Sequence, residues 1–176
     1  MRLGNLRQYL SHNTPDDQIR ARWIMMAARA IALIHRYGIV HADISTRNFL
    51  VADDLSIKLC DFAGSAVGDV GPLVEEEDRY RMPCSSRSTM TDIFALGCLI
   101  FEIGTGLRPF DGLGDDCFED IRGRYLVGEF PCLDGLLYRV VVYKCWTGRY
   151  ESVDLLLCDL GVLIAGKRVF DRIISR

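Results

Sequence analysis

The stretch HADISTRNFLVADDLSIKLCDFAG, residues 41–64, decides the fold of this chain. It opens with a polar run that includes Asp43 and Asn48, and two apolar segments, NFLVAD and SIKLCDF, follow. These segments flank the pair Asp53-Asp54, and a turn pair between two short apolar runs is typical of a β-hairpin. The sequence therefore predicts a polar loop that leads into a small hairpin.

Helical patterns dominate the rest of the chain. The segment NTPDDQIRARWIMMAARAIALIHRYG predicts a helix with Thr14 as its cap, Pro15 at its first position and Gly38 as its stop. Apolar residues recur in it at helical spacing and are expected to pack in the core: Ile19, Trp23, Met26, Ala27, Ala30, Ile31 and Ile34. The segment TDIFALGCLIFEIGTG predicts a buried helix that ends near Gly104 or Gly106.

Three further segments predict helices: DDCFEDIRGRY, CLDGLLYRVVVYKCW and SVDLLLCDLGVLI. Residues 64–90 are expected to be irregular because glycines and prolines interrupt any pattern there, and the acidic cluster at 75–78 is typical of a solvated loop. The fold class predicted is mainly α with one small hairpin.

Composition limits the partners and the compartment. The chain has 176 residues, of which 49% are hydrophobic and 26% charged, and its net charge is −3. These values predict a globular domain and argue against nucleic acid as a partner. No apolar run has the length of a membrane span, and MRLGNLRQYL lacks the core of a secretion signal. We therefore expect an intracellular protein, and the sequence does not fix its oligomeric state.

The cysteines do not form a metal-binding pattern. They lie at Cys60, Cys84, Cys98, Cys117, Cys132, Cys145 and Cys158. None forms a Cys-x-x-Cys pair, so a zinc site is not expected. We interpret most of them as reduced core residues, and a disulfide framework is the alternative.

Oxygen-bearing side chains gather around the predicted hairpin. Asp43 and Asn48 are five residues apart, and Asp61 follows thirteen residues later, so the three could converge at one end of the hairpin. Carboxylate and amide oxygens suit Mg²⁺ together with phosphate oxygens. Each residue also has a structural reading: Asp43 could hold a turn, Asn48 could cap one, Asp61 could be a loop acid, and His41 could be a core imidazole.

Taken in order, these motifs resemble the large, C-terminal lobe of eukaryotic protein kinases. HADISTRN is similar to the catalytic loop and DFAG to the Asp-Phe-Gly metal motif. YRMPCSS stands at the end of the activation segment, TDIFALGCLIFEIGTGLRPF matches the long buried helix, and KCWTGRYES matches a Cys-Trp region. The resemblance covers about Leu3 to Leu160. The segments HADIS, DFAGS and YRMP are most similar to those of fungal kinase-like proteins. The resemblance divides the chain into a kinase-like lobe, 1–160, and a helical tail, 161–176.

The resemblance implies ATP and Mg²⁺ as cofactors and a protein hydroxyl as the acceptor. Asp43 would be the catalytic base, while Asn48 and Asp61 would hold the Mg²⁺ ions that bridge the phosphates. Leu50 would lie under the adenine ring.

The same resemblance assigns supporting positions around these residues. Asn5 and Leu6 would lie near the ribose, where the chain enters the lobe. His41 and Phe62 would stack in the hydrophobic column of the active state. Asp92 would anchor the backbone of the catalytic loop.

The chain departs from the family pattern at several positions. Ala42 replaces the arginine that pairs with a loop phosphate, so any activity is expected to be independent of loop phosphorylation. Ala63 replaces the motif glycine, and Cys84 replaces the glutamate of Ala-Pro-Glu. Ser45 stands where Ser/Thr kinases carry lysine, and Arg47 gives a pattern closer to tyrosine kinases, so the acceptor residue stays open.

The sequence also begins where the large lobe of a kinase begins. A Gly-rich loop, a strand lysine and its glutamate partner all belong to the small lobe. We expect the small lobe to be absent and the isolated chain to be weak or inactive. Three hypotheses remain: a kinase whose small lobe is lost or supplied elsewhere, a kinase-like binding module for a protein partner, and a truncated gene product.

Overall fold

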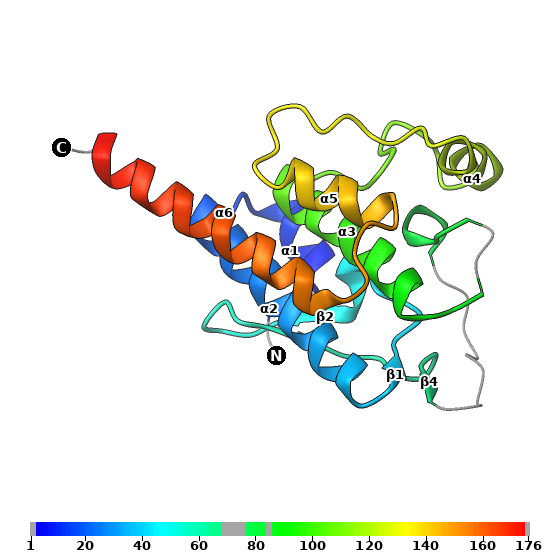
Figure 1. Cartoon of the computed structure of the whole chain (residues 1–176). Helices are drawn as coiled ribbons and strands as arrows, with labels where there is room; N and C mark the ends of the chain where they lie inside the picture. Colours follow the sequence, from blue (N-terminus) through cyan, green and yellow to red (C-terminus); the bar gives the residue numbers. More distant parts are fainter. Residues whose placement is uncertain (1–2, 68–76, 84–85, 175–176) are drawn as a thin grey trace.

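The computed structural model describes residues 3–67, 77–83 and 86–174, with side chains as far as Lys167. The architecture is mainly helical, as predicted (Figure 1). Its helices are α1 (Leu6–His12), α2 (Asp17–Arg36), α3 (Thr89–Thr105), α4 (Phe118–Leu126), α5 (Arg139–Trp146) and α6 (Val153–Ile174). Its strands are β1 (Ile39–Val40), β2 (Phe49–Val51), β3 (Ile57–Leu59) and β4 (Ala66–Val67), and two 3₁₀ turns cover Thr46–Asn48 and Asp78–Tyr80.

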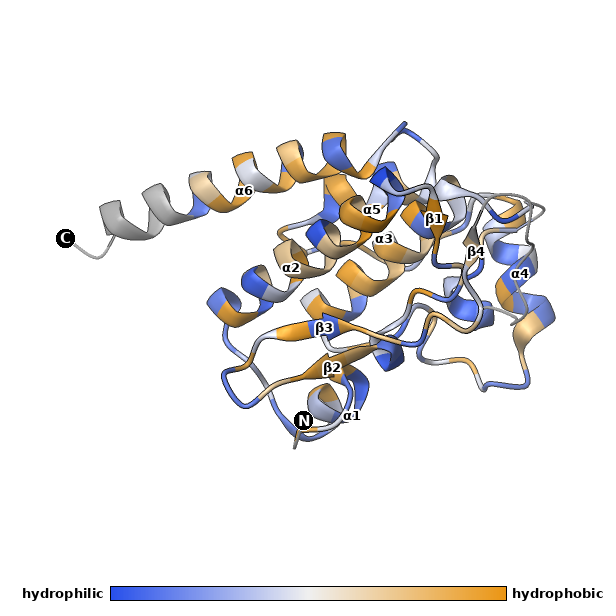
Figure 2. Ribbon diagram, turned by 90° about the horizontal axis from the view of Figure 1, so that it is seen from below, coloured by the Kyte–Doolittle hydropathy of each residue, from blue (hydrophilic) through white to orange (hydrophobic). Residues whose placement is uncertain are grey.

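The apolar helix α3 forms the centre of the fold. Every residue from Thr91 to Ile103 is buried, because α2 packs on one side of α3 and α5 on another. Figure 2 shows α3 as a predominantly hydrophobic ribbon between these neighbours. The helix ends at Gly106, whose φ of +82° is readily available only to glycine. The predicted buried helix and its stop are therefore confirmed.

Helix α2 buries part of the predicted stripe, while the other predicted positions, Ile19, Met26, Ala30 and Ile34, are only partly buried. Trp23, Ala27 and Ile31 are buried as expected, but Ile24 and Ala28 are buried as well. Helix α2 is covered on several sides, because α3, β3 and α6 all pack against it, and α6 lies along it (Figure 1). The distant C-terminal helix thus completes the packing of a helix near the start of the chain.

The predicted start of α2 was wrong. Asp16, rather than Thr14, caps the helix, since its side-chain oxygen accepts a 2.8 Å hydrogen bond from the backbone N–H of Ile19. Pro15 precedes the cap and is buried outside the helix. Aspartate is a stronger cap than threonine, and this preference decides the boundary.

The predicted hairpin is confirmed, and a second small sheet accompanies it. Strands β2 and β3 pair antiparallel, with Phe49 opposite Leu59. Strands β1 and β4 also pair antiparallel, with Val40 opposite Ala66. The expectation that residues 64–90 are irregular was wrong for β4, because its partner strand lies far away in the sequence.

Two other expectations need correction. Helix α5 begins at Arg139, later than predicted, because Gly135 has a φ of +76° in the preceding loop. Most cysteines were expected in the core, but among the described cysteines only Cys98 and Cys145 are buried. Cys84 and the acidic positions 75 and 76 lie outside the described residues.

Helix α6 continues through position 160 without interruption, as far as Ile174. Its first half packs on α2 and α5, and Lys167 forms an ion pair with Asp17 at the start of α2. Within the described ranges, no helix combines the length and the apolarity that crossing a bilayer requires.

The contact between α3 and α5 gives a stability prediction. A Cβ atom at Gly97 would lie 2.5 Å from the Cβ of Cys145 and 3.3 Å from Trp146. We expect Gly97→Ala to lower the free energy of unfolding by about 1–3 kcal/mol, because a well-packed core resists added volume. Urea denaturation would measure the change.

Gly123 in α4 provides the matched control. A Cβ there would meet no atom within 4 Å, so Gly123→Ala should stabilise the helix by about 0.5–1 kcal/mol. Equal effects of the two substitutions would contradict the close approach of α3 and α5.

Candidate active site

The polar loop holds Asp43 and Asn48 against each other. The side-chain amide of Asn48 donates hydrogen bonds to the backbone oxygen of Asp43, at 2.6 Å, and to its Oδ2 atom, at 2.8 Å. The 3₁₀ turn Thr46–Asn48 brings the amide back toward Asp43. The other carboxylate oxygen, Oδ1, is buried and has no hydrogen-bond partner among the described residues. The loop therefore presents an oriented carboxylate with one free acceptor.

The hairpin brings Asp61 to the same end as Asn48. The backbone N–H of Cys60 donates a 2.9 Å hydrogen bond to the backbone oxygen of Asn48, one step beyond the β2–β3 ladder. Asp61 follows directly, is exposed and has a φ of +60°. A non-glycine residue in this region is uncommon and often marks a functional site.

Asp92 of α3 supports the start of the loop. Its two carboxylate oxygens accept hydrogen bonds from the backbone N–H groups of His41, at 2.8 Å, and Ala42, at 2.9 Å. Its Oδ2 atom also lies 2.8 Å from Nε2 of His35 in α2. Ala42 has a φ of +65°, so these bonds hold a strained backbone. A buried carboxylate thus fixes the entry to the loop.

His41 and Phe62 lie together beside this anchor. Their ring centroids are 5.0 Å apart, His41 is fully buried, and Phe62 is 46% exposed. The contact links the loop to the segment after β3. It leaves one apolar ring open at the surface next to Asp61.

The predicted nucleotide-binding residues occupy different environments. An antiparallel bridge joins Asn5 to Leu50, and the backbone N–H of Val51 donates to the backbone oxygen of Gly4. The side chain of Asn5 caps α1, while that of Leu6 is wholly inside the core. The side chain of Leu50 on β2 is partly exposed and does not cap a helix, so of the three predicted residues it is the one available to a ligand. The nucleotide contacts themselves stay a prediction.

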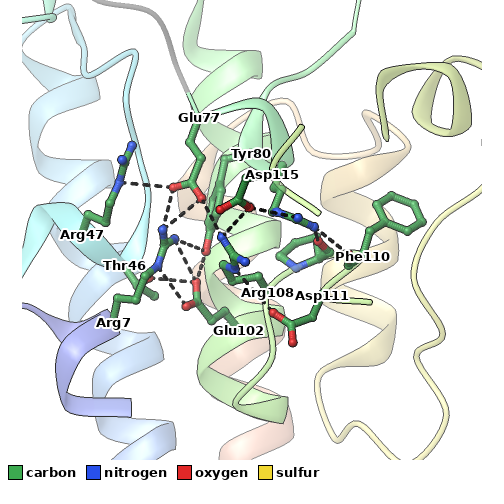
Figure 3. Close-up of polar contacts among 12 residues, drawn as sticks. Arg7, Thr46, Arg47, Glu77, Tyr80, Glu102, Arg108, Phe110, Asp111 and Asp115 are labelled. Carbon is green, nitrogen blue, oxygen red and sulfur yellow. Dashed lines mark hydrogen bonds and ion pairs between the residues drawn. The ribbon is translucent and has the colours of Figure 1, made fainter. Parts of the chain in front are cut away.

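Sequence reasoning missed an ionic network beneath the loop, shown in Figure 3. The guanidinium of Arg7 bonds to Thr46, Glu102 and Glu77, and the hydroxyl of Tyr80 donates to Glu102. Burial raises the pKa of Glu102, although Arg7 and Thr46 oppose the shift. Burial would lower the pKa of Arg7, but the carboxylates of Glu102 and Glu77 outweigh it and raise the pKa.

One signal could have revealed this network. Glu102 lies within the apolar run LIFEIG, and a glutamate in a buried helix almost always has a partner. The identity of that partner was not predictable, because Arg7 lies 95 residues away in the sequence.

Asp92 gives a prediction about the rigidity of the loop. Asp92→Asn keeps one acceptor oxygen but turns an amide toward the second backbone N–H. We expect a loss of about 1–3 kcal/mol in the free energy of unfolding, measured with urea. Asp154→Asn, which removes the exposed ion pair with Arg36, should cost less than about 1 kcal/mol. A cost for Asp92→Asn no larger than that of this control would show that the anchor carries little stability.

Comparison with known proteins identifies the family of this site. The family model described as a protein kinase domain matches residues 1–127. A probable serine/threonine-protein kinase PknB of Lactococcus lactis is 31% identical over 88% of this chain, and the serine/threonine-protein kinase PknB of Mycolicibacterium smegmatis is 30% identical over 76%. The serine/threonine/tyrosine-protein kinase HT1 of Arabidopsis thaliana is 27% identical over 84%.

The matched region is a limited part of each relative. It covers 27% of the Lactococcus protein, 24% of the Mycolicibacterium protein and 40% of the Arabidopsis protein. Within that region the loop, the hairpin and the buried helix of this chain follow one another as the sequence motifs predicted. The chain belongs to the protein kinase family.

Proposed function

We propose that this chain forms the lower part of an ATP- and Mg²⁺-dependent phosphoryl-transfer site that acts on a protein hydroxyl. The buried Oδ1 atom of Asp43 carries the proposal. A buried carboxylate oxygen without a donor is costly unless a ligand supplies one. An acceptor hydroxyl would supply such a donor. Asp43 would therefore orient the hydroxyl and take its proton as catalytic base.

The donor set also fits Mg²⁺. The amide nitrogen of Asn48 is committed to Asp43, which leaves its Oδ1 atom as a possible ligand. Asp61 offers an exposed carboxylate at the same end of the hairpin. The described residues include no group of three or more His, Cys, Asp or Glu side chains that could hold a metal. Mg²⁺ often binds through one or two protein ligands plus phosphates and water, so this sparse set suits it.

When bound, Mg²⁺ would neutralise charge on the nucleotide phosphates. The residues of this chain would orient that complex. Leu50 would contact the adenine, and the backbone bridge between Asn5 and Leu50 would fix the floor of the site. Leu6 would support that floor from the core, and His41 would hold Phe62 beside Asp61.

Residues 1–176 contain no Gly-rich loop of the kinase type, and the lysine on strand β3, Lys58, follows the catalytic loop instead of preceding it. Positioning and electrostatic stabilisation provide most of the rate in phosphoryl transfer. We therefore propose that these 176 residues bind the nucleotide weakly and transfer phosphate slowly by themselves. The chain spans less than half the length of the curated relatives named above, so their whole activity is not assigned to it.

A protein-binding scaffold is the second candidate function. Ala42 favours the scaffold, because it replaces the arginine that is usual at this position. The backbone oxygen of Ala42 instead accepts a hydrogen bond from the guanidinium of Arg87. Binding of nucleotide separates the two candidates, since a scaffold would not require the metal-binding pair.

Nucleotide binding is the first test of the proposal. Mg²⁺·ATP should raise the melting temperature of the chain in a thermal-shift assay, because a ligand that binds the folded state stabilises it. Asp61→Asn should remove the shift, while Asp53→Asn on the exposed hairpin turn should leave it intact. Absence of any shift with the wild-type chain at saturating Mg²⁺·ATP would favour the scaffold.

The role of Asp43 is tested by phosphoryl transfer. We expect Asp43→Asn to lower the transfer rate by roughly 100-fold or more, because it removes the base. The thermal shift with Mg²⁺·ATP should persist in this variant, since Asp43 is not assigned to the metal. Transfer from radiolabelled ATP to a mixed protein substrate would measure the rate. A rate unchanged by Asp43→Asn would exclude its assignment as base.

A further inference from the structure

Three arginine side chains converge on one carboxylate next to the catalytic loop. Nη1 of Arg7 lies 2.9 Å from each oxygen of Glu77, and Nε of Arg47 lies 3.2 Å from its Oε2 atom. Nη1 of Arg108 approaches Oε1 at 4.0 Å. Figure 3 shows the three arginine side chains around Glu77, each from a different segment. We call Arg7, Arg47 and Arg108 the arginine cluster.

The cluster lines a surface cavity of about 270 Å³. Arg7 comes from α1, Arg47 from the catalytic loop and Arg108 from the loop after α3. Phe118 of α4 also lines the cavity. Segments around the catalytic loop therefore line one surface cavity, which is large enough for a peptide side chain.

Two members of the arginine cluster, Arg7 and Arg108, have partners other than Glu77. Arg7 keeps its bonds to Glu102 and Thr46, and Arg108 pairs with Asp111 and Asp115 as well. Removal of Glu77 would therefore leave these two guanidinium groups oriented. Guanidinium groups held in this way are preorganised for another anion, which lowers the entropic cost of binding it.

Arg47 depends on Glu77 more strongly. Among the ion pairs between described residues, Arg47 takes part only in the one with Glu77. The side chain of Arg47 is 49% exposed. An incoming acidic group would meet this half-exposed cation first, and a basic group would be repelled by it. Asp78 and Asp115 also line the cavity, and Asp115 is paired with Arg108, so Arg47 is the lining cation that most favours an incoming anion.

We propose that the arginine cluster recognises an acidic side chain of the peptide whose hydroxyl reaches Asp43, and that Glu77 occupies this place as an internal competitor. The inference rests on the proposed function, because it assumes that the peptide presents its hydroxyl to Asp43. The acid would be a carboxylate or a phosphorylated side chain, since a guanidinium fork binds either.

The chain sets an upper limit on the spacing within that peptide. Arg47 follows Asp43 by four residues, so their Cα atoms are at most about 14 Å apart. An extended peptide covers this distance in about four residues. The recognised acid should therefore lie within a few positions of the acceptor hydroxyl.

The test measures peptide binding without nucleotide, by fluorescence anisotropy on the purified chain. Three labelled peptides differ at one position near the acceptor, which carries Glu, Gln or phosphoserine. Glu77→Gln should raise the affinity for the Glu peptide about 10-fold and leave that for the Gln peptide unchanged, because a charge-assisted bond is gained. Adding Arg47→Gln to this variant should remove the gain.

Arg36→Gln serves as the matched control, because Arg36 pairs with Asp154 on an exposed part of α2. It should change no affinity. If Glu77→Gln raises the affinity for the phosphoserine peptide more than that for the Glu peptide, a phosphorylated side chain is the favoured acid. If it raises the affinity for the phosphoserine peptide equally or less, the carboxylate is the favoured acid. The proposal is overturned if Glu77→Gln gives the Glu and Gln peptides equal affinity while its melting temperature matches that of the wild type.

A second variant covers the case in which Glu77→Gln fails to fold. Arg47→Glu changes only a half-exposed side chain, and it should reverse the preference so that a Lys peptide binds better than the Glu peptide. No reversal would also overturn the proposal. If the chain prefers the acidic peptides but shows no thermal shift with Mg²⁺·ATP, the proposed kinase function is rejected and the acid-binding site is retained. If it shows the thermal shift but no preference for acidic peptides, only the acid-binding site is rejected.

Discussion

The rest of the candidate site depends on the carboxylate of Asp92. It lies in the first turn of the buried apolar helix α3 and accepts hydrogen bonds from two successive backbone N–H groups, those of His41 and Ala42. Charge-assisted bonds of this kind are stronger than neutral ones, and their loss inside a protein is costly. The loop can therefore hold a left-handed residue at position 42 because α3 fixes the backbone on which that residue lies.

Glu102 extends this support to the other end of the loop. It lies ten residues after Asp92 on α3, which corresponds to about 15 Å along the helix axis. Asp92 bonds to the backbone at the start of the loop, whereas Glu102 bonds to the side chains of Thr46 and Arg7. One rigid helix thus carries both fixed points. Between these fixed points, the 3₁₀ turn lets Asn48 donate its two hydrogen bonds to Asp43.

Local patterns predicted the elements, and long-range contacts escaped prediction. The hairpin and the buried helix could be predicted because turn residues and apolar runs act over a few positions. The cap was misplaced by two residues, from Asp16 to Thr14, because both side chains can cap. Strand β4 and the bond between Arg7 and Glu102 were missed because each needs a partner distant in the sequence, and pairing across such distances leaves no local signal.

The loop concentrates features that oppose stability. Among the described side chains, the buried polar atoms without a partner are His41 Nδ1, Asp43 Oδ1 and Ser45 Oγ, all within five residues. Two of the four described non-glycine residues with left-handed φ, Ala42 and Asp61, lie in or next to this loop. Each such feature costs on the order of 1–3 kcal/mol. A scaffold that bound partners through its helices would gain nothing from these costs, whereas a site that awaits a hydroxyl and a metal requires polar atoms held open. The distribution of strain therefore favours chemistry at this loop.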